Sequence, residues 1–125
     1  MLSYDYSPYL LPTIDFVGGE TQNLAFHVYF HTKERPFSLT GCTCNFSIVS
    51  FRNKMGAPIL TKVMTPVFGG VVDNVLTVEL TSKETVELYG KYIYQICIRD
   101  IDGEVEIPKQ GILYITNNIN KNFIK

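Results

Sequence analysis

The chain contains no tryptophan, only three cysteines and no long apolar run. An odd number of cysteines does not form a disulfide framework, and Cys42 and Cys44 are one residue too close for the C-x-x-C of common zinc and thioredoxin-like sites. Free cysteines also pack as small hydrophobic side chains, so we expect these two in the core, with a metal site or a disulfide as the alternatives. Cys97 lies an odd number of residues from Tyr94 and Ile96, so if those two side chains face inward, Cys97 is expected to face outward. No apolar stretch approaches the ~18 residues that span a bilayer, which predicts no membrane span.

Charge of one sign is also scarce. The 125 residues include 11 Lys and Arg and 12 Asp and Glu, which gives a net charge of −1, and the basic residues form no run. Binding through phosphates depends on clustered Lys and Arg, so we expect no nucleic-acid partner. The N-terminus lacks a basic region, and Asp5, Pro8 and Pro12 interrupt its apolar residues, so no export signal is expected.

Catalytic patterns are absent from the sequence. It contains no G-x-S-x-G, no Walker loop and no G-x-G-x-x-G. Glu104 and Glu106 flank a turn, whereas glycoside hydrolysis needs paired carboxylates that face one another. His27 and His31 would lie about 13 Å apart on a strand, too far to share one metal ion. We therefore expect no enzyme and no cofactor.

Residues 100–103 (DIDG) resemble the start of a calcium loop, but the EF-hand pattern needs Gly at its sixth place and Glu at its twelfth. Here Gly103 is fourth, so we predict a type I turn with Gly in the left-handed conformation, and no metal site.

Alternation of apolar and polar residues with period two recurs along the chain and indicates strands. It covers residues 24–31, 42–48, 59–64, 75–80, 91–99, 104–107 and 110–116. No helical period of 3.6 appears. We predict an all-β fold, an immunoglobulin-like two-sheet antiparallel sandwich of seven to eight strands with one short helical turn near 82–88. The expected organisation is an arm with a first edge strand in 1–21, the sandwich in 22–119 and a tail in 120–125.

The segment 90–98 (GKYIYQICI) predicts the inward face most clearly. Tyr92 is expected to act as a tyrosine corner, with a buried ring and a hydroxyl bonded to nearby backbone. The side chains expected in the structural core are Tyr92, Tyr94, Ile96, Leu88, Phe26, Val28 and Phe46.

Turn and cap signals divide the strands. Thr81 and Glu84 fit a capping box at the start of the helical turn, and Gly90 suits its left-handed end. Residues 53–56 (NKMG) indicate a hairpin turn in which Gly56 can take a positive φ. Pro66 breaks the alternation, so any strand close after it should be an edge piece.

The N-terminal arm is rich in tyrosine and leucine and is interrupted by prolines. Either it is a loose arm behind an edge strand near residues 13–17, or it docks on a partner subunit. The candidate interface residues are Tyr4, Tyr6, Tyr9, Leu10 and Phe123.

Four segments in order resemble one known family. They are residues 37–48 (FSLTGCTCNFSI), 75–85 (VLTVELTSKET), 88–96 (LYGKYIYQI), and 100–103 (DIDG) with 111–115 (GILYI). Together they are similar to the immunoglobulin-like domain of phage baseplate upper proteins and related prophage tail proteins. The resemblance covers roughly residues 22–119.

The resemblance implies a non-catalytic structural component of a phage or prophage tail or baseplate. Its expected partners are other tail or baseplate subunits, including copies of itself, and its expected place is the virion, assembled in the bacterial cytoplasm. The alternative is a bacterial β-sandwich module that binds carbohydrate or a surface ligand, with Tyr29, Tyr89 and Tyr114 as aromatic platforms.

Overall fold

The computed structural model describes residues 2–4, 11–30, 36–107 and 110–124, and it is built mainly of strands. The all-β class expected from the sequence is confirmed. Within the described ranges the elements are β1 (Leu2–Tyr4), β2 (Ile14–Val17), β3 (Gln22–Phe30), β4 (Thr43–Ser50), the 3₁₀ turn η1 (Phe51–Asn53), β5 (Leu60–Val67), β6 (Val75–Leu80), α1 (Ser82–Thr85), β7 (Gly90–Arg99), β8 (Val105–Glu106), β9 (Gly111–Thr116) and the 3₁₀ turn η2 (Lys121–Phe123). No helix among these residues has the length and apolar character needed to cross a bilayer.

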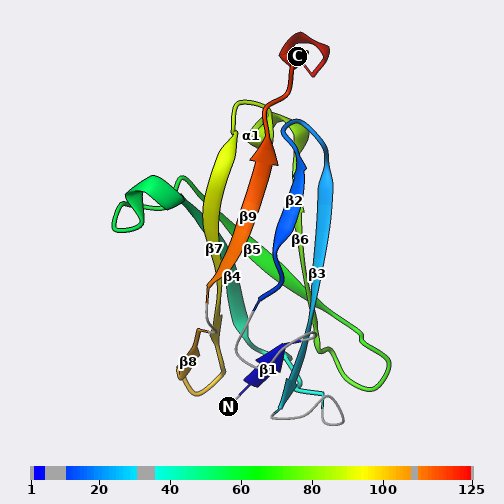
Figure 1. Ribbon diagram of the computed structural model, residues 1–125. Coiled ribbons are helices and arrows are strands. Elements are labelled where there is room, and N and C mark those ends of the chain that lie inside the picture. The colour runs from blue at the N-terminus through cyan, green and yellow to red at the C-terminus, as the bar shows by residue number, and fades with distance from the viewer. Residues whose placement is uncertain (1, 5–10, 31–35, 108–109, 125) are drawn as a thin grey trace.

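The strands form one continuous sheet in the order β1-β3-β6-β5-β4-β7-β9-β2, and β8 adds to β7 (Figure 1). Neighbouring strands are antiparallel except for β2 and β9, which run in parallel with Phe16 opposite Ile115. The amide of Gly18 extends this ladder by donating to the carbonyl of Thr116 at 2.9 Å. β2 is therefore an edge strand, and Glu20 covers part of that edge because its carboxylate accepts from the Val17 amide at 3.0 Å.

β5 belongs to two ladders. Its first half pairs with β4, with Leu60 opposite Ile48, while Thr65–Val67 pairs with β6. Pro66 lies inside this second half, opposite Leu76, so the strand continues past the end expected at residue 64; the prediction that a strand close after Pro66 is an edge piece is confirmed. The proline is tolerated because Thr65–Val67 pairs with a neighbour on one side only, which leaves the position without a required ladder donor on the other.

The sheet curls into a half-barrel around its apolar face. Phe26 on β3 and Tyr94 on β7 are four positions apart in the strand order, yet their ring centroids lie 6.0 Å apart. Phe46 on β4 stacks on the same tyrosine ring at 5.5 Å. Only a strongly curved sheet brings these strands together, and the enclosed side chains form one core.

Alternation of side chains explains which face is buried. On β7, Tyr92, Tyr94, Ile96 and Ile98 are buried, as are Phe26, Val28 and Phe46 on their own strands. Leu88, ahead of β7, is half-buried and packs against this core. The Tyr92 hydroxyl donates to the Tyr89 carbonyl at 3.0 Å and accepts from the Tyr89 amide at 3.1 Å.

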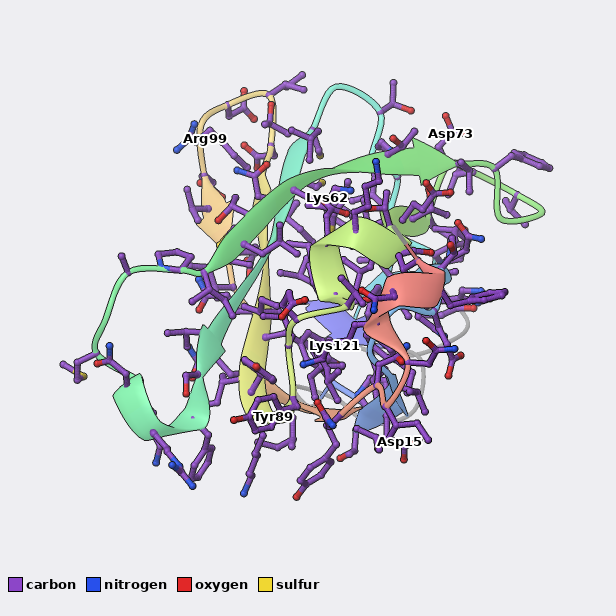
Figure 2. The ribbon with its side chains drawn as sticks, turned by 90° about the horizontal axis from the view of Figure 1, so that it is seen from above. Asp15, Lys62, Asp73, Tyr89, Arg99 and Lys121 are labelled. Carbon is purple, nitrogen blue, oxygen red and sulfur yellow. The ribbon has the colours of Figure 1, made fainter. Side chains whose placement is uncertain are left out.

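α1 is a single turn with the capping box expected for Thr81 and Glu84. The Thr81 hydroxyl accepts from the Glu84 amide, and the Glu84 carboxylate accepts from the Thr81 amide at 2.8 Å. Lys62 reaches from β5 to this carboxylate at 2.8 Å and also donates to the Glu79 carbonyl at 2.7 Å (Figure 2). The ammonium thus bridges β5 to β6 where their ladder has ended.

Two loops differ from expectation. The turn predicted at residues 53–56 is present, because the Gly56 amide donates to the Asn53 carbonyl at 3.0 Å in the connection between the antiparallel β4 and β5, but it follows η1 and Gly56 does not take a positive φ. A Cβ at Gly56 would lie 2.5 Å from Asn53 Nδ2, so the exposed Asn53 side chain would have to move aside. At the N-terminus, residues 2–4 form β1 against β3 of the same chain, a strand that the sequence did not predict.

Candidate functional site

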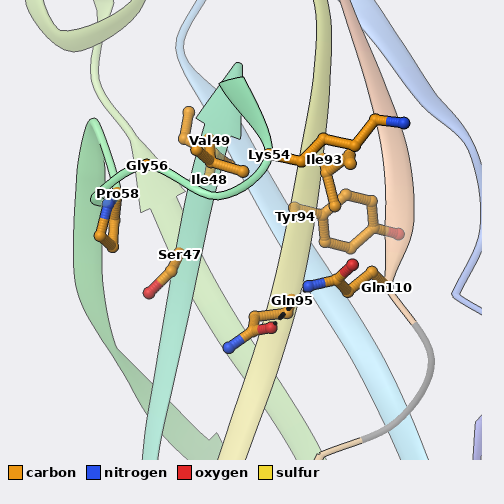
Figure 3. A pocket seen from close by; sticks show the side chains of 10 residues that line it. All are labelled: Ser47, Ile48, Val49, Lys54, Gly56, Pro58, Ile93, Tyr94, Gln95 and Gln110. Carbon is orange, nitrogen blue, oxygen red and sulfur yellow. Dashed lines mark hydrogen bonds between the residues drawn. The ribbon is translucent and has the colours of Figure 1, made fainter. Parts of the chain in front are cut away.

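A pocket of about 160 Å³ opens on the outer face of β4 and β7, beneath the η1 loop (Figure 3). Ile93 on β7 supplies an apolar floor, and the lower rim of the pocket is polar. Its lining consists of Ser47, Ile48, Val49, Lys54, Gly56, Pro58, Ile93, Tyr94, Gln95 and Gln110. The pocket is smaller than the ~300–1,000 Å³ of sites for drug-sized ligands, so it suits one ring-sized group.

Hydrogen bonds fix the polar rim. Gln110 donates through Nε2 to Gln95 Oε1 at 2.9 Å, and Gln95 donates to Cys97 Sγ at 3.3 Å. Ser47 shares a hydrogen bond of 3.0 Å with Thr61 on β5. The Gln110 side-chain oxygen has no partner among the described residues, which leaves it able to accept from a ligand hydroxyl.

Tyr94 supports the pocket from the core side. Its hydroxyl donates to the carbonyl of Pro12, and burial holds the pKa of this phenol well above its ordinary value. Gly111 begins β9 directly over the ring, where a Cβ would lie 2.5 Å from ring carbon Cε1. Tyr94 is therefore a rigid neutral wall and not a titrating group.

A row of cations and aromatic rings continues from the pocket rim. Lys54 and Lys91 place their ammonium groups 4.0 and 3.8 Å from the centroid of the Phe51 ring, and Lys91 lies 5.9 Å from the centroid of Tyr114. The Lys54 side chain crosses the upper part of the pocket (Figure 3). Within the described ranges neither lysine has a carboxylate partner, so both positive charges are uncompensated locally.

The three tyrosines expected as a ligand platform do not form one. Tyr114 is 43% exposed on β9, opposite Lys91, and Tyr89 is 65% exposed ahead of β7. Tyr29 is half-buried on β3, which is separated from β7 and β9 in the strand order. Only Tyr114 of the three contributes to the row of cations and rings.

The candidate interface residues are only partly described. Tyr6, Tyr9 and Leu10 lie outside the described residues, and Tyr4 is described by its backbone, which pairs with Val28. Phe123 lies in η2 and is 83% exposed.

The cysteines and the acidic turn have structural environments. All three cysteines are free; Cys44 is buried, and Cys42 packs against the core. Burial and the neighbouring Cys42 raise the pKa of Cys44 to about 11, so its thiol stays protonated near neutral pH. Asp100 Oδ1 accepts from the amides of Asp102 and Glu104, both at 2.9 Å, which uses this carboxylate to close the turn.

The alternative of a metal site has no supporting cluster of side chains in the described part of the chain. No group of three or more His, Cys, Asp or Glu side chains there is placed to hold a metal ion. Gly103 has φ 88°, the left-handed conformation predicted for the turn. His27 is exposed on β3, and His31 lies outside the described residues.

Sequence reasoning missed the pocket and its lysines. Lys54 follows η1, Lys91 is on β7 and Gln110 precedes β9, so no spacing along the chain joins them. The pairing of Lys91 with Tyr114 depends on the β7–β9 register.

No protein-family model matches the chain, and a search of curated proteins found no match.

Proposed function

We propose that the curled sheet is an immunoglobulin-like sandwich. In this interpretation β3, β6 and the second half of β5 form one layer, and the first half of β5 forms the other with β4, β7, β9 and β2. The strand order supports it, because such domains pair their second strand with their fifth, and their third, sixth and seventh strands with one another. Counted from β2 and without β8, these strands are β3 with β6, and β4 with β7 and β9. The hydroxyl of Tyr92, bonded to backbone three residues upstream at the start of β7, agrees with a tyrosine corner.

On this scaffold we propose a non-catalytic structural component of a phage or prophage tail or baseplate. The observation that carries the proposal is the ordered resemblance of four segments. These segments fall on β4, on β6 with α1, on β7, and on the turn and strand that end in β9. The chain would act through contacts with other tail subunits and with copies of itself, within the virion.

Exposed apolar turns supply a surface for such contacts. Phe68 and Val71, between β5 and β6, are 66% and 74% exposed. Ile101, in the turn between β7 and β8, is 75% exposed. Both turns extend from the end of the sheet opposite the C-terminus (Figure 1). Exposed apolar side chains such as these are typical of surfaces that become buried on assembly.

Solution size and electron microscopy test this function. We expect the chain to form oligomers and an antibody against it to label purified tail particles. Phe68→Ser with Val71→Ser should shift the population toward monomer. Met55→Ser, a change at a fully exposed apolar residue of the η1 loop, is the matched control and should not. A chain that is monomeric at all concentrations and missing from particles would contradict the proposal.

A second candidate function is binding of a saccharide. The observation that favours it is the pocket of Figure 3, where hydroxyl and amide groups line one side of an apolar floor. Such a combination suits a sugar ring, which has polar edges and an apolar face. Binding of simple sugars that is lost on Gln110→Ala but kept on Gln22→Ala, a surface glutamine on β3, would favour this function.

A further inference from the structure

We propose that this pocket, with Lys54 and Lys91 beside it, binds an acidic sugar residue, a ring that carries a carboxylate. The inference rests on the saccharide-binding function above and names its ligand class. It combines the size of the cavity, the uncompensated charges at its rim and the hydrogen-bonding groups that line it.

The ammonium groups of Lys54 and Lys91 lie close together. The two ammonium groups approach the same ring centroid at 4.0 and 3.8 Å, so they lie no farther apart than the sum of these distances. Two like charges held this close repel one another, and the face of Phe51 offsets only part of that cost. A bound carboxylate would interact favourably with both ammonium groups. Asp15, on β2, lies opposite Tyr114 of β9, but its carboxylate makes no ion pair with Lys54 or Lys91.

The pocket then selects what is attached to the carboxylate. A volume of about 160 Å³ excludes a large ligand but leaves room for one ring. Ile93 and Pro58 provide apolar contact, while Ser47 and Gln110, whose side-chain oxygen has no partner among the described residues, line the same space as hydrogen-bonding groups. An anion without a ring would leave the floor and the polar rim uncovered, so it should bind more weakly than the acidic sugar.

A nuclear magnetic resonance titration of the full chain tests the proposal. The probes are glucuronic acid, glucose and acetate, which separate the acidic ring, the neutral ring and the bare carboxylate. We expect glucuronic acid to bind most tightly, with shifts at Ile93 and Gln95, and its affinity to fall between about 0.01 M and about 0.15 M salt.

Variants assign the effect to the lysines. Lys54→Met or Lys91→Met should lower the affinity for glucuronic acid about tenfold, since each removes one charged hydrogen bond. Lys91 does not line the pocket, so Lys91→Met should leave glucose binding unchanged. Lys83→Met, at an exposed residue of α1, is the matched loss of charge and should change the affinity for neither sugar. Gln110→Ala should weaken both sugars. Thermal unfolding checks that each variant remains folded.

The outcomes separate the inference from the function on which it rests. If glucose binds as tightly as glucuronic acid, saccharide binding stands and the acidic specificity is wrong. If acetate binds as tightly as glucuronic acid, the lysines form a simple anion site and the inference also fails. If neither sugar shifts the pocket resonances, both the inference and the saccharide-binding function are overturned.

Discussion

Tyr92→Phe removes a single hydroxyl that holds the start of β7 to the preceding turn. This hydroxyl donates to the Tyr89 carbonyl at 3.0 Å and accepts from the Tyr89 amide at 3.1 Å. Each hydrogen bond contributes roughly 0.5–1.5 kcal/mol net, so the variant should lose about 1–3 kcal/mol of unfolding free energy. Tyr92→Ala also removes a ring that is only 7% exposed, and it should cost on the order of 3–5 kcal/mol.

Urea unfolding followed by circular dichroism measures these losses. The urea concentration at the midpoint of unfolding should fall. The slope of the unfolding free energy against urea concentration should stay constant, since the surface exposed on unfolding is the same. Tyr114→Phe is the control, because that hydroxyl lies on a half-exposed ring and makes no hydrogen bond within the described ranges; its effect should stay within about 0.5 kcal/mol. A loss below about 1 kcal/mol for Tyr92→Ala would refute the packing argument, and equal effects of the two Phe variants would refute the role of the hydroxyl.

Four further outcomes are expected. Gly111→Ala places a Cβ 2.5 Å from the Tyr94 ring and should cost about 1–3 kcal/mol in urea unfolding; a neutral effect would show that the ring can move away. Thr81→Ala removes the cap of α1 and should cost about 1 kcal/mol. In the same box, burial alone would raise the pKa of Glu84, but hydrogen bonds from Lys62 and Thr81 and the Lys62 charge lower it. Stability from Glu84 is therefore complete above its ordinary pKa and is lost as the pH falls through the lowered value, a loss that Lys62→Met should reduce in acid titrations. Burial raises the pKa of Tyr94, so the folded state holds this proton more tightly than the unfolded chain; stability should be complete below about pH 10 and fall above it, and less so in Tyr94→Phe.

Local patterns predicted most of the strands because their physical causes are local. Alternation on 90–98 places every second side chain on one face, and the structure buries Tyr94 and Ile96 on that face. The capping box at Thr81 and Glu84 depends only on residues three apart, and it is present.

Other features required the partner strand. Pro66 indicates a break when the chain is considered alone, yet it lies within β5 because that half of the strand has a neighbour on one side only. β1 carries no recognisable alternation and exists through its pairing with β3. The lysines beside the pocket come together because β4 and β7 are neighbours in the sheet, with Ser50 opposite Tyr92, and this pairing is not encoded in sequence spacing.

The parallel pairing of β2 with β9 has a mechanical consequence. β2 follows β1 near the N-terminus, and β9 is the last strand described, so pulling on the two ends of the chain drags β2 and β9 past each other along their length once β1 has separated from β3 (Figure 1). Their hydrogen bonds are then loaded together in shear and do not open one by one. Single-molecule stretching from both ends should therefore register one high rupture force, and it should drop when Phe16→Pro removes the amide at the centre of the pair.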